Sequence, residues 1–162
     1  DTAKFLGVLI DSKLSWKSHI KYITKKVAKS IGIIKRVHNC LPTDTLNTLY
    51  NTLVLPYLNY CNMIWANNKT MYLKPLLILQ KKVVRSITAS LYNAHALPLF
   101  AQLNQLTIYD LNKLALATFM FRSHTNSLPP IFSDYFVVNS AVHCHYIHAV
   151  QSNFVFPLLA PT

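Results

Sequence analysis

Acidic residues are scarce in this sequence. Five Asp and no Glu stand against sixteen Lys and Arg, so the 162 residues carry a formal net charge of +11. Two-metal catalysis needs carboxylates that converge within a few ångströms, and isolated acids such as these do not supply them. The cationic excess favours polyanionic partners, either nucleic acid or an anionic membrane surface.

Glycine and cysteine are also few. Two Gly exclude collagen-like and Gly-rich low-complexity chains. The three Cys lie far apart, at Cys40, Cys61 and Cys144. An odd number at wide spacing does not form a disulfide scaffold, and it favours a reducing, intracellular setting.

Long hydrophobic runs are missing as well. The apolar segment 114–121 is far shorter than the ~20 residues that a membrane-spanning helix needs. The longest uncharged stretch of sustained apolar character, 45–68, contains Pro56 and several Asn, whose polar groups lipid would leave unsatisfied. We therefore expect no transmembrane segment. No basic region precedes a small-residue cleavage site, so we expect no signal peptide either.

The chain does contain enough apolar material for one domain. Hydrophobic residues make up 52% of the sequence, which suffices for the core of a domain of ordinary size. The sequence starts at Asp1 rather than at Met, and it runs directly into an apolar segment. We therefore expect it to be a piece of a longer protein.

Hydrophobic periodicity predicts a mainly α-helical fold preceded by one short strand or hairpin edge. The run 4–10 is nearly continuous and apolar, which predicts a buried strand that ends in a turn at Asp11–Ser12. From Ser15, the predicted N-cap, apolar residues recur every three or four positions to about Val37. This spacing places them on one face of a helix.

The next helices have recognisable boundaries. A helix capped by Thr43 should be kinked or split at Pro56, because proline removes a backbone donor. After a loop at Asn67–Asn68, a third helix is expected from about 71 to 88, and a short one from 98 to 103.

A last helix is expected near the C-terminal end. Thr107 and Asp110 resemble a capping box, and the helix should run to about His124. Its apolar residues lie on most sides, which predicts burial. Beyond 131 no clean period remains, so an irregular tail is expected.

Positive charge is concentrated in the first half of the chain. Residues 1–36 hold nine Lys and Arg and two Asp. Residues 37–85 hold five Lys and Arg and one Asp, and residues 86–162 hold two Lys and Arg and two Asp. A polyanion should therefore meet the first half, while the neutral second half should mainly pack.

The polar face of the first helix carries a ridge of cations. Lys17, Lys21, Lys25 and Lys29 are spaced by four, and each step advances ~6 Å along the helix axis and drifts ~40° around it. This advance is comparable to the spacing of successive phosphates on a strand. Tyr22 lies in the same arc, where its ring can stack on a base or sugar. The remaining cations of the arc are Lys26, Lys35 and Arg36.

The third helix repeats this arrangement. Lys74, Lys81 and Arg85 share one face, with Lys82 at its edge and the apolar residues opposite. Such a face can be merely solvated, but solvated faces usually mix both signs of charge, whereas here like charges repel unless an anion arrives. The single sign favours phosphate contacts, driven by counterion release.

Five segments resemble LINE-type (Jockey-like, LTR-less) retrotransposon reverse transcriptases. They are KFLGVLIDSKLSWKSHIKYITKKVAKSIGIIKR, LNTLYNTLVLPYLNYCNMIW, LKPLLILQKKVVRSIT, PLFAQLNQLTIYDL and LALATFMFRSHTNSLPPIF, in the order of that family. The resemblance covers about residues 4–132. After His143 it is loose, and Ile147–His148 replace the usual Thr-Arg of the family.

The resemblance implies a division of the chain into parts. Residues 1–12 would form the primer-grip strand at the edge of the polymerase palm, with Lys4, Phe5, Leu6 and Gly7 matching its motif. Residues 13–90 would form a thumb-like helical bundle, 91–130 additional packing helices, and 131–162 the irregular tail. Trp16 and His19, which match the start of the thumb helix, are expected to pack or cap rather than bind.

The resemblance also implies a function. The family's catalytic Tyr-x-Asp-Asp strand would lie upstream of Asp1, so this fragment of an RNA-directed DNA polymerase should not polymerise alone. It should hold template–primer by its sugar–phosphate backbone. Magnesium would belong to the parent polymerase and no cofactor to this chain. The partners would be RNA, an RNA/DNA hybrid or DNA, and the palm, but no membrane.

Other interpretations remain open. The chain can be a stand-alone or decayed helical interaction module without a catalytic role, or a cationic amphipathic helix on an anionic membrane. His143, His145 and His148 have a spacing that suits zinc or copper, although a solvated tail is the simpler interpretation.

Overall fold

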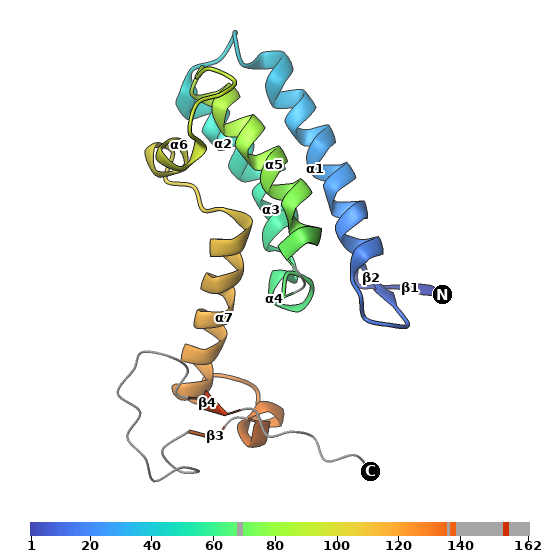
Figure 1. Cartoon of the computed structure of the whole chain (residues 1–162). Helices are drawn as coiled ribbons and strands as arrows, with labels where there is room; N and C mark the ends of the chain where they lie inside the picture. The colour runs from blue at the N-terminus through green and yellow to red at the C-terminus, as the bar shows by residue number, and fades with distance from the viewer. Residues whose placement is uncertain (68–69, 136, 139–153, 156–162) are drawn as a thin grey trace. The chain divides into compact units, whose positions relative to one another are not determined.

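The computed structural model describes residues 1–67, 70–135, 137–138 and 154–155, and it divides into two compact units, 1–115 and 116–162. Figure 1 shows a short hairpin at the N-terminus followed by helices. The predicted mainly α-helical fold with a hairpin edge is therefore confirmed.

An antiparallel hairpin opens the chain. Strand β1 (Thr2–Phe5) pairs with β2 (Val8–Asp11), and Phe5 lies opposite Val8. Leu6 and Gly7 form the turn with φ angles of 44° and 84°, the positive values that tight hairpin turns require. The predicted single buried strand over 4–10 is wrong, because this turn divides it. All of β1 is exposed, and Val8 is the one buried residue of the two strands.

Helix α1 (Lys17–Val37) begins after a turn held by one carboxylate. Asp11 accepts backbone hydrogen bonds from Lys13 (3.1 Å), Ser15 (2.9 Å) and Trp16 (2.9 Å). The bond from the Ser15 N–H is the main cause that lowers the pKa of Asp11 below its usual value. The predicted N-cap Ser15 is wrong. Trp16 takes that position with a φ of 57°, and the Ser15 hydroxyl donates to Asp11 instead.

The apolar stripe of α1 faces the core as predicted. Ile20, Ile23, Val27, Ile31 and Ile34 are each at most 4% exposed. Since these positions share one side of the helix, the intervening lysines must lie on the other sides.

Residues 43–65 form the next three helices. Helix α2 (Thr43–Leu53) gives way to α3 (Leu55–Asn59) next to Pro56, so the predicted split is confirmed. Thr43 was expected to cap α2 but is its first residue, and Pro42 occupies the N-cap position. Helix α4 (Asn62–Trp65) then buries its Trp65, whose indole N–H donates to the carbonyl of Tyr60 at 2.8 Å.

Helix α5 (Thr70–Ile87) matches the predicted third helix. It packs against α1, and both helices run in the same direction (Figure 1). Asn67 is non-helical as expected, and Asn68 lies outside the described residues. The predicted short helix is α6 (Ala96–Gln102), which packs on α5.

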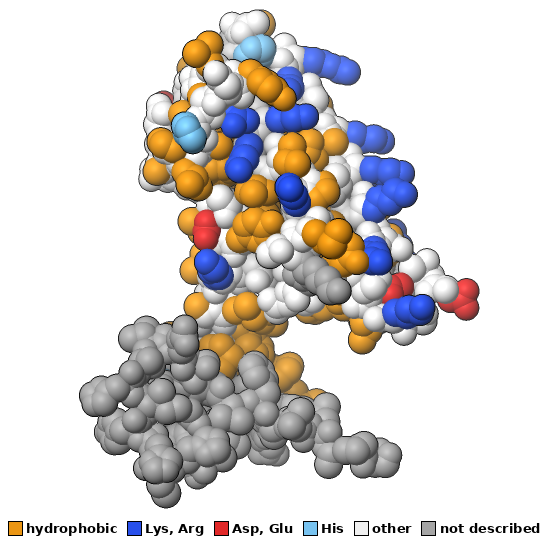
Figure 2. Space-filling view, viewed as in Figure 1, with side chains coloured by type: hydrophobic (Ala, Val, Ile, Leu, Met, Phe, Trp, Pro, Cys, Tyr) orange, Lys and Arg blue, Asp and Glu red, His pale blue; other side chains and the backbone are white. Residues whose placement is uncertain are grey.

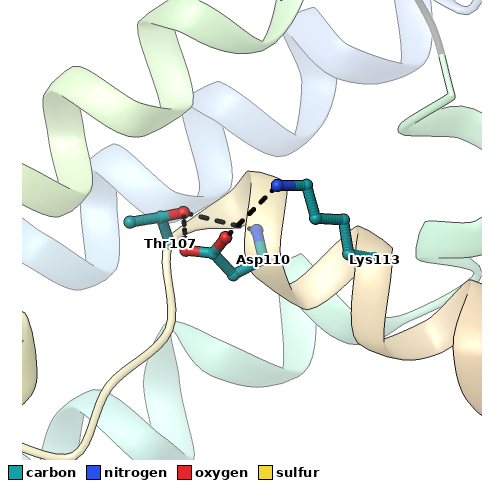
Figure 3. Close-up of polar contacts among 3 residues, drawn as sticks. All are labelled: Thr107, Asp110 and Lys113. Carbon is teal, nitrogen blue, oxygen red and sulfur yellow. Dashed lines mark hydrogen bonds and ion pairs between the residues drawn. The ribbon is translucent and has the colours of Figure 1, made fainter. Parts of the chain in front are cut away.

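Helix α7 (Ile108–His124) starts at the predicted capping box. The Thr107 hydroxyl donates to the Asp110 carboxylate at 2.6 Å, and the Asp110 N–H donates back to the Thr107 oxygen at 3.3 Å (Figure 3). The predicted burial of α7 is wrong. Only Ile108 and Leu111 in its first turn are buried, whereas Leu114 and Phe121 are 55% and 65% exposed.

The second unit contains few described elements. These are the end of α7, a 3-10 helix (Pro130–Tyr135) and two short antiparallel strands, β3 (Val137–Val138) and β4 (Phe154–Val155). Within this unit, Phe119 and Phe132 meet edge to face at a centroid distance of 5.8 Å.

A buried glutamine links three segments of the first unit. The amide nitrogen of Gln80 on α5 donates to the Tyr50 hydroxyl of α2 (2.8 Å) and to the Leu106 carbonyl (3.2 Å). Its amide oxygen accepts from the Ile108 N–H at 2.8 Å. Burial raises the pKa of Tyr50 to about 12, so this hydroxyl stays neutral.

Replacing Gln80 with Met should lower the free energy of unfolding by about 2–4 kcal/mol, because the buried Tyr50 hydroxyl and Ile108 N–H lose their partners. Urea denaturation followed by circular dichroism measures this loss. The control is Gln102→Met on the exposed side of α6, expected within about 0.5 kcal/mol of the wild type. Equal effects of the two changes would contradict the role of the Gln80 amide.

His19 joins the hairpin to α1 and is 2% exposed. Its Nδ1 accepts from the Leu9 N–H at 3.2 Å, and its ring lies edge-on to Trp65 at 5.7 Å. Nε2 is buried without a hydrogen-bond partner. His19 therefore packs, as the sequence predicted, and its burial lowers its pKa below 6.5.

This pKa shift predicts a pH dependence of stability. The unfolded chain binds the His19 proton more readily than the folded chain does. The His19 contribution to the free energy of unfolding should thus be intact above about pH 6.5 and decline as the pH falls below that value. We expect this decline to be shallower in His19→Gln and unchanged in the exposed control His95→Gln, by thermal denaturation between pH 7.5 and 5. A pH profile of His19→Gln parallel to that of the wild type would refute the contribution of His19 to this pH dependence.

Candidate nucleic-acid interface

The cations predicted on the first helix form an exposed surface along α1. The inward apolar stripe forces them outward, and Figure 2 shows Lys and Arg side chains projecting along this edge of the molecule. The exposed members of this surface, the α1 ridge, are Lys17, Lys21, Lys25, Lys29, Lys35 and Arg36, and Lys26 is half-buried.

Two of these lysines lie over aromatic rings. The Lys17 ammonium is 5.1 Å from the ring centre of Tyr72 on α5, and that of Lys26 is 5.5 Å from Tyr22. Such cation–π contacts are worth about 0.5–1 kcal/mol at exposed sites, too little to exclude an anionic ligand. Tyr22 is 37% exposed and also stacks near His19, so only part of its ring is open to a base.

The basic residues of α5 lie on the face of the molecule drawn in Figure 2, over α5. Lys74 and Lys82 are exposed, whereas Lys81 and Arg85 are half-buried. Arg85 has a structural contact, since its Nε donates to the carbonyl of Ala94 at 2.8 Å. That bond ties α5 to the loop that precedes α6.

The structure brings cations of both helices together at one place. A cavity of about 520 Å³ lies where α1 and α5 end; we call it the end pocket. Its lining residues are Lys35, His38, Asn39, Lys82, Arg85, Ser86, Ala89, Ser90 and Tyr92. The sequence predicted three of these cations separately but missed the pocket. The only available signal was that both helices end in basic residues.

Carboxylates of the described residues do not neutralise the lysines of α1 and α5. Within the described residues, the one ion pair joins Lys113 and Asp110 at 3.9 Å (Figure 3). It lies in α7, apart from the basic helices. In the described part of the chain, the lysines of α1 and α5 therefore have no acidic partner.

The segment that resembles a primer grip lies at the other end of α1. Lys4 and Phe5 are exposed in β1, and the Leu6 carbonyl accepts from the Tyr60 hydroxyl at 2.6 Å. A Cβ on Gly7 would stand 3.8 Å from the Tyr60 ring, an ordinary contact, so it is the positive φ that calls for glycine. The length of α1, about 30 Å, separates this hairpin from the end pocket.

The described residues contain no group of three or more His, Cys, Asp or Glu that could hold a metal ion. The candidate ligands His143, His145 and His148 lie outside the described residues.

None of the helices among the described residues combines the length and apolar character needed to cross a membrane.

The fold and this surface define a helical protein with an unpaired cationic face on two parallel helices. Over 114 residues, or 68% of the chain, its sequence is 29% identical to the probable RNA-directed DNA polymerase from transposon X-element of Drosophila melanogaster. The chain spans only 12% of the length of that protein. No family model and no solved structure matches the chain. The similarity supports a distant relationship to transposon reverse transcriptases.

Proposed function

We propose that this chain is a thumb-like part of a LINE-type retrotransposon reverse transcriptase that binds template–primer. The ligand is RNA, an RNA/DNA hybrid or DNA, held by its sugar–phosphate backbone without reading the sequence. The observation that carries this proposal is the single-sign charge of α1 and α5, whose exposed lysines have no carboxylate partner in the described part of the chain.

The spacing of the α1 ridge suits a phosphate backbone. Lysines four residues apart advance ~6 Å along the helix axis, and the ridge drifts ~40° per step. A strand that follows this drift meets several ammonium groups in succession. Each phosphate that is neutralised releases condensed counterions, and this release supplies the affinity.

The hairpin would connect this surface to the polymerase palm. Phe5, Leu6 and Leu14 are 64%, 74% and 61% exposed, although all three are large and apolar. We propose that the palm contacts them and that catalytic magnesium belongs to the palm. Such a protein would work inside the cell, where its nucleic acid is located.

The membrane alternative fits the fold less well. An amphipathic helix on a bilayer must insert its apolar side, and in α1 that side is buried in the core. Release of α1 would expose the core that it forms with α5.

The salt dependence of binding tests the proposal. If four to six phosphates are contacted, the logarithm of the association constant for an RNA/DNA duplex should fall with the logarithm of salt concentration at a slope of about −4 to −5. Fluorescence anisotropy with the full chain measures this slope. A slope near zero would reject phosphate binding and favour an interaction module.

The ridge itself is tested by Lys21→Gln, Lys25→Gln and Lys29→Gln combined. Each lost phosphate contact should make the slope less negative by about 1. The slope of the triple variant should therefore be less negative than that of the wild type by about 2–3. The matched control is Lys13→Gln, Lys113→Gln and Arg122→Gln, which removes the same charge elsewhere and should keep the slope. If both triples behave alike, net charge and not the ridge governs binding. Circular dichroism checks that both remain folded.

A further inference from the structure

The end pocket collects donors that the protein itself does not use. In the described part of the chain, Lys35 and Lys82 make no hydrogen bond or ion pair through their ammonium groups. Arg85 uses only its Nε, towards Ala94, which holds the guanidinium in place. Figure 2 shows Lys and Arg side chains close to a His side chain at the end of the bundle where α1 and α5 finish.

Helix ends alone do not account for these cations. One carbonyl in the last turn of each helix already has a partner, because Lys35 O receives the His38 ring N–H (2.7 Å) and Arg85 O the Ser90 N–H (3.0 Å). Each helix C-terminus contributes roughly −0.5 charge. The two termini and the three cations Lys35, Lys82 and Arg85 together therefore leave a net charge of about +2. The pocket therefore remains an attractive site for an anion.

The hydrogen bond of His38, which lines the end pocket, defines the tautomer of its neutral ring. A carbonyl oxygen can only accept, so Nδ1 must carry the proton in its contact with Lys35 O. In the neutral ring, Nε2 is then an acceptor that a sugar hydroxyl or a base amino group can use.

An exposed aromatic ring lines the same pocket. Tyr92 is 83% exposed in the loop between α5 and α6. The loop is held by backbone bonds from Ser90 to Arg85 (3.0 Å) and from Ala94 to Leu91 (3.0 Å). An aromatic ring next to phosphate-binding cations is the arrangement on which unpaired bases stack.

We propose that the end pocket holds one unpaired nucleotide, with its phosphate bound by Lys35, Lys82 and Arg85 and its base stacked on Tyr92. A volume of about 520 Å³ lies in the usual range of small-ligand sites and is large enough for one nucleotide. This inference rests on the proposed function. It adds that a single-stranded extension of the bound duplex ends or turns at this end of the bundle.

The test compares two ligands with the full chain. One is a blunt RNA/DNA duplex and the other is the same duplex with a five-nucleotide single-stranded extension. We expect the extension to increase affinity about tenfold in the wild type, since stacking of one base on an aromatic ring has effects of this size. Tyr92→Ala should abolish this gain, Tyr92→Phe should retain it, and the adjacent exposed control Leu91→Ala should leave it unchanged.

The charge of the pocket is tested in the same assay. Lys82→Gln should reduce the gain from the extension, whereas Lys13→Gln, in the loop before α1, should not. No gain in the wild type, or a gain that survives Tyr92→Ala, would overturn the nucleotide pocket and leave the proposed function standing. A gain that depends on Tyr92, with a salt slope near zero for the blunt duplex, would instead support the pocket and reject the α1 ridge as a duplex-binding surface.

Discussion

The parallel packing of α1 against α5 is the constraint on which the rest of the structure depends. Both helices bury one apolar stripe in a shared core, so their lysines can only lie at the surface. Because the helices run in the same direction, their basic C-terminal turns meet at one end of the bundle. The buried amide of Gln80 secures this packing by linking α5 to α2 and to the segment before α7.

The two ends of α1 carry different features. At its start, the hairpin is attached through the Leu9 bond to His19 and the Tyr60 bond to Leu6, and it presents exposed apolar residues. At its far end lies the cationic end pocket. Between them runs the α1 ridge. Its like charges repel one another, and burial of the opposite, apolar face of α1 offsets this repulsion. In the proposed function, a duplex would lie along the ridge with its ends held by different chemistry.

Much of the helical fold could be predicted, because its signals are local. The three- and four-residue spacing of α1, the split at Pro56 and the capping box of Thr107 and Asp110 each depend on neighbours in the sequence. The errors arose where contacts that the hydrophobic period does not report decide the structure. The Leu6–Gly7 turn adopts positive φ angles and accepts a hydrogen bond from the distant Tyr60, and the carboxylate of Asp11 replaces Ser15 at the start of α1. Apolar residues of α7 predicted burial, but Leu114 is 55% exposed.

The sequence by itself determined which helices form and which of their faces are cationic, because residue order alone sets the helical period and the excess of lysine over acid. Only the tertiary structure decided that Lys35 meets Lys82 and Arg85, that Tyr92 joins them, and that Lys17 lies over Tyr72. The physical reason is that the direction and register of two packed helices depend on how their buried side chains interlock, which no single segment encodes.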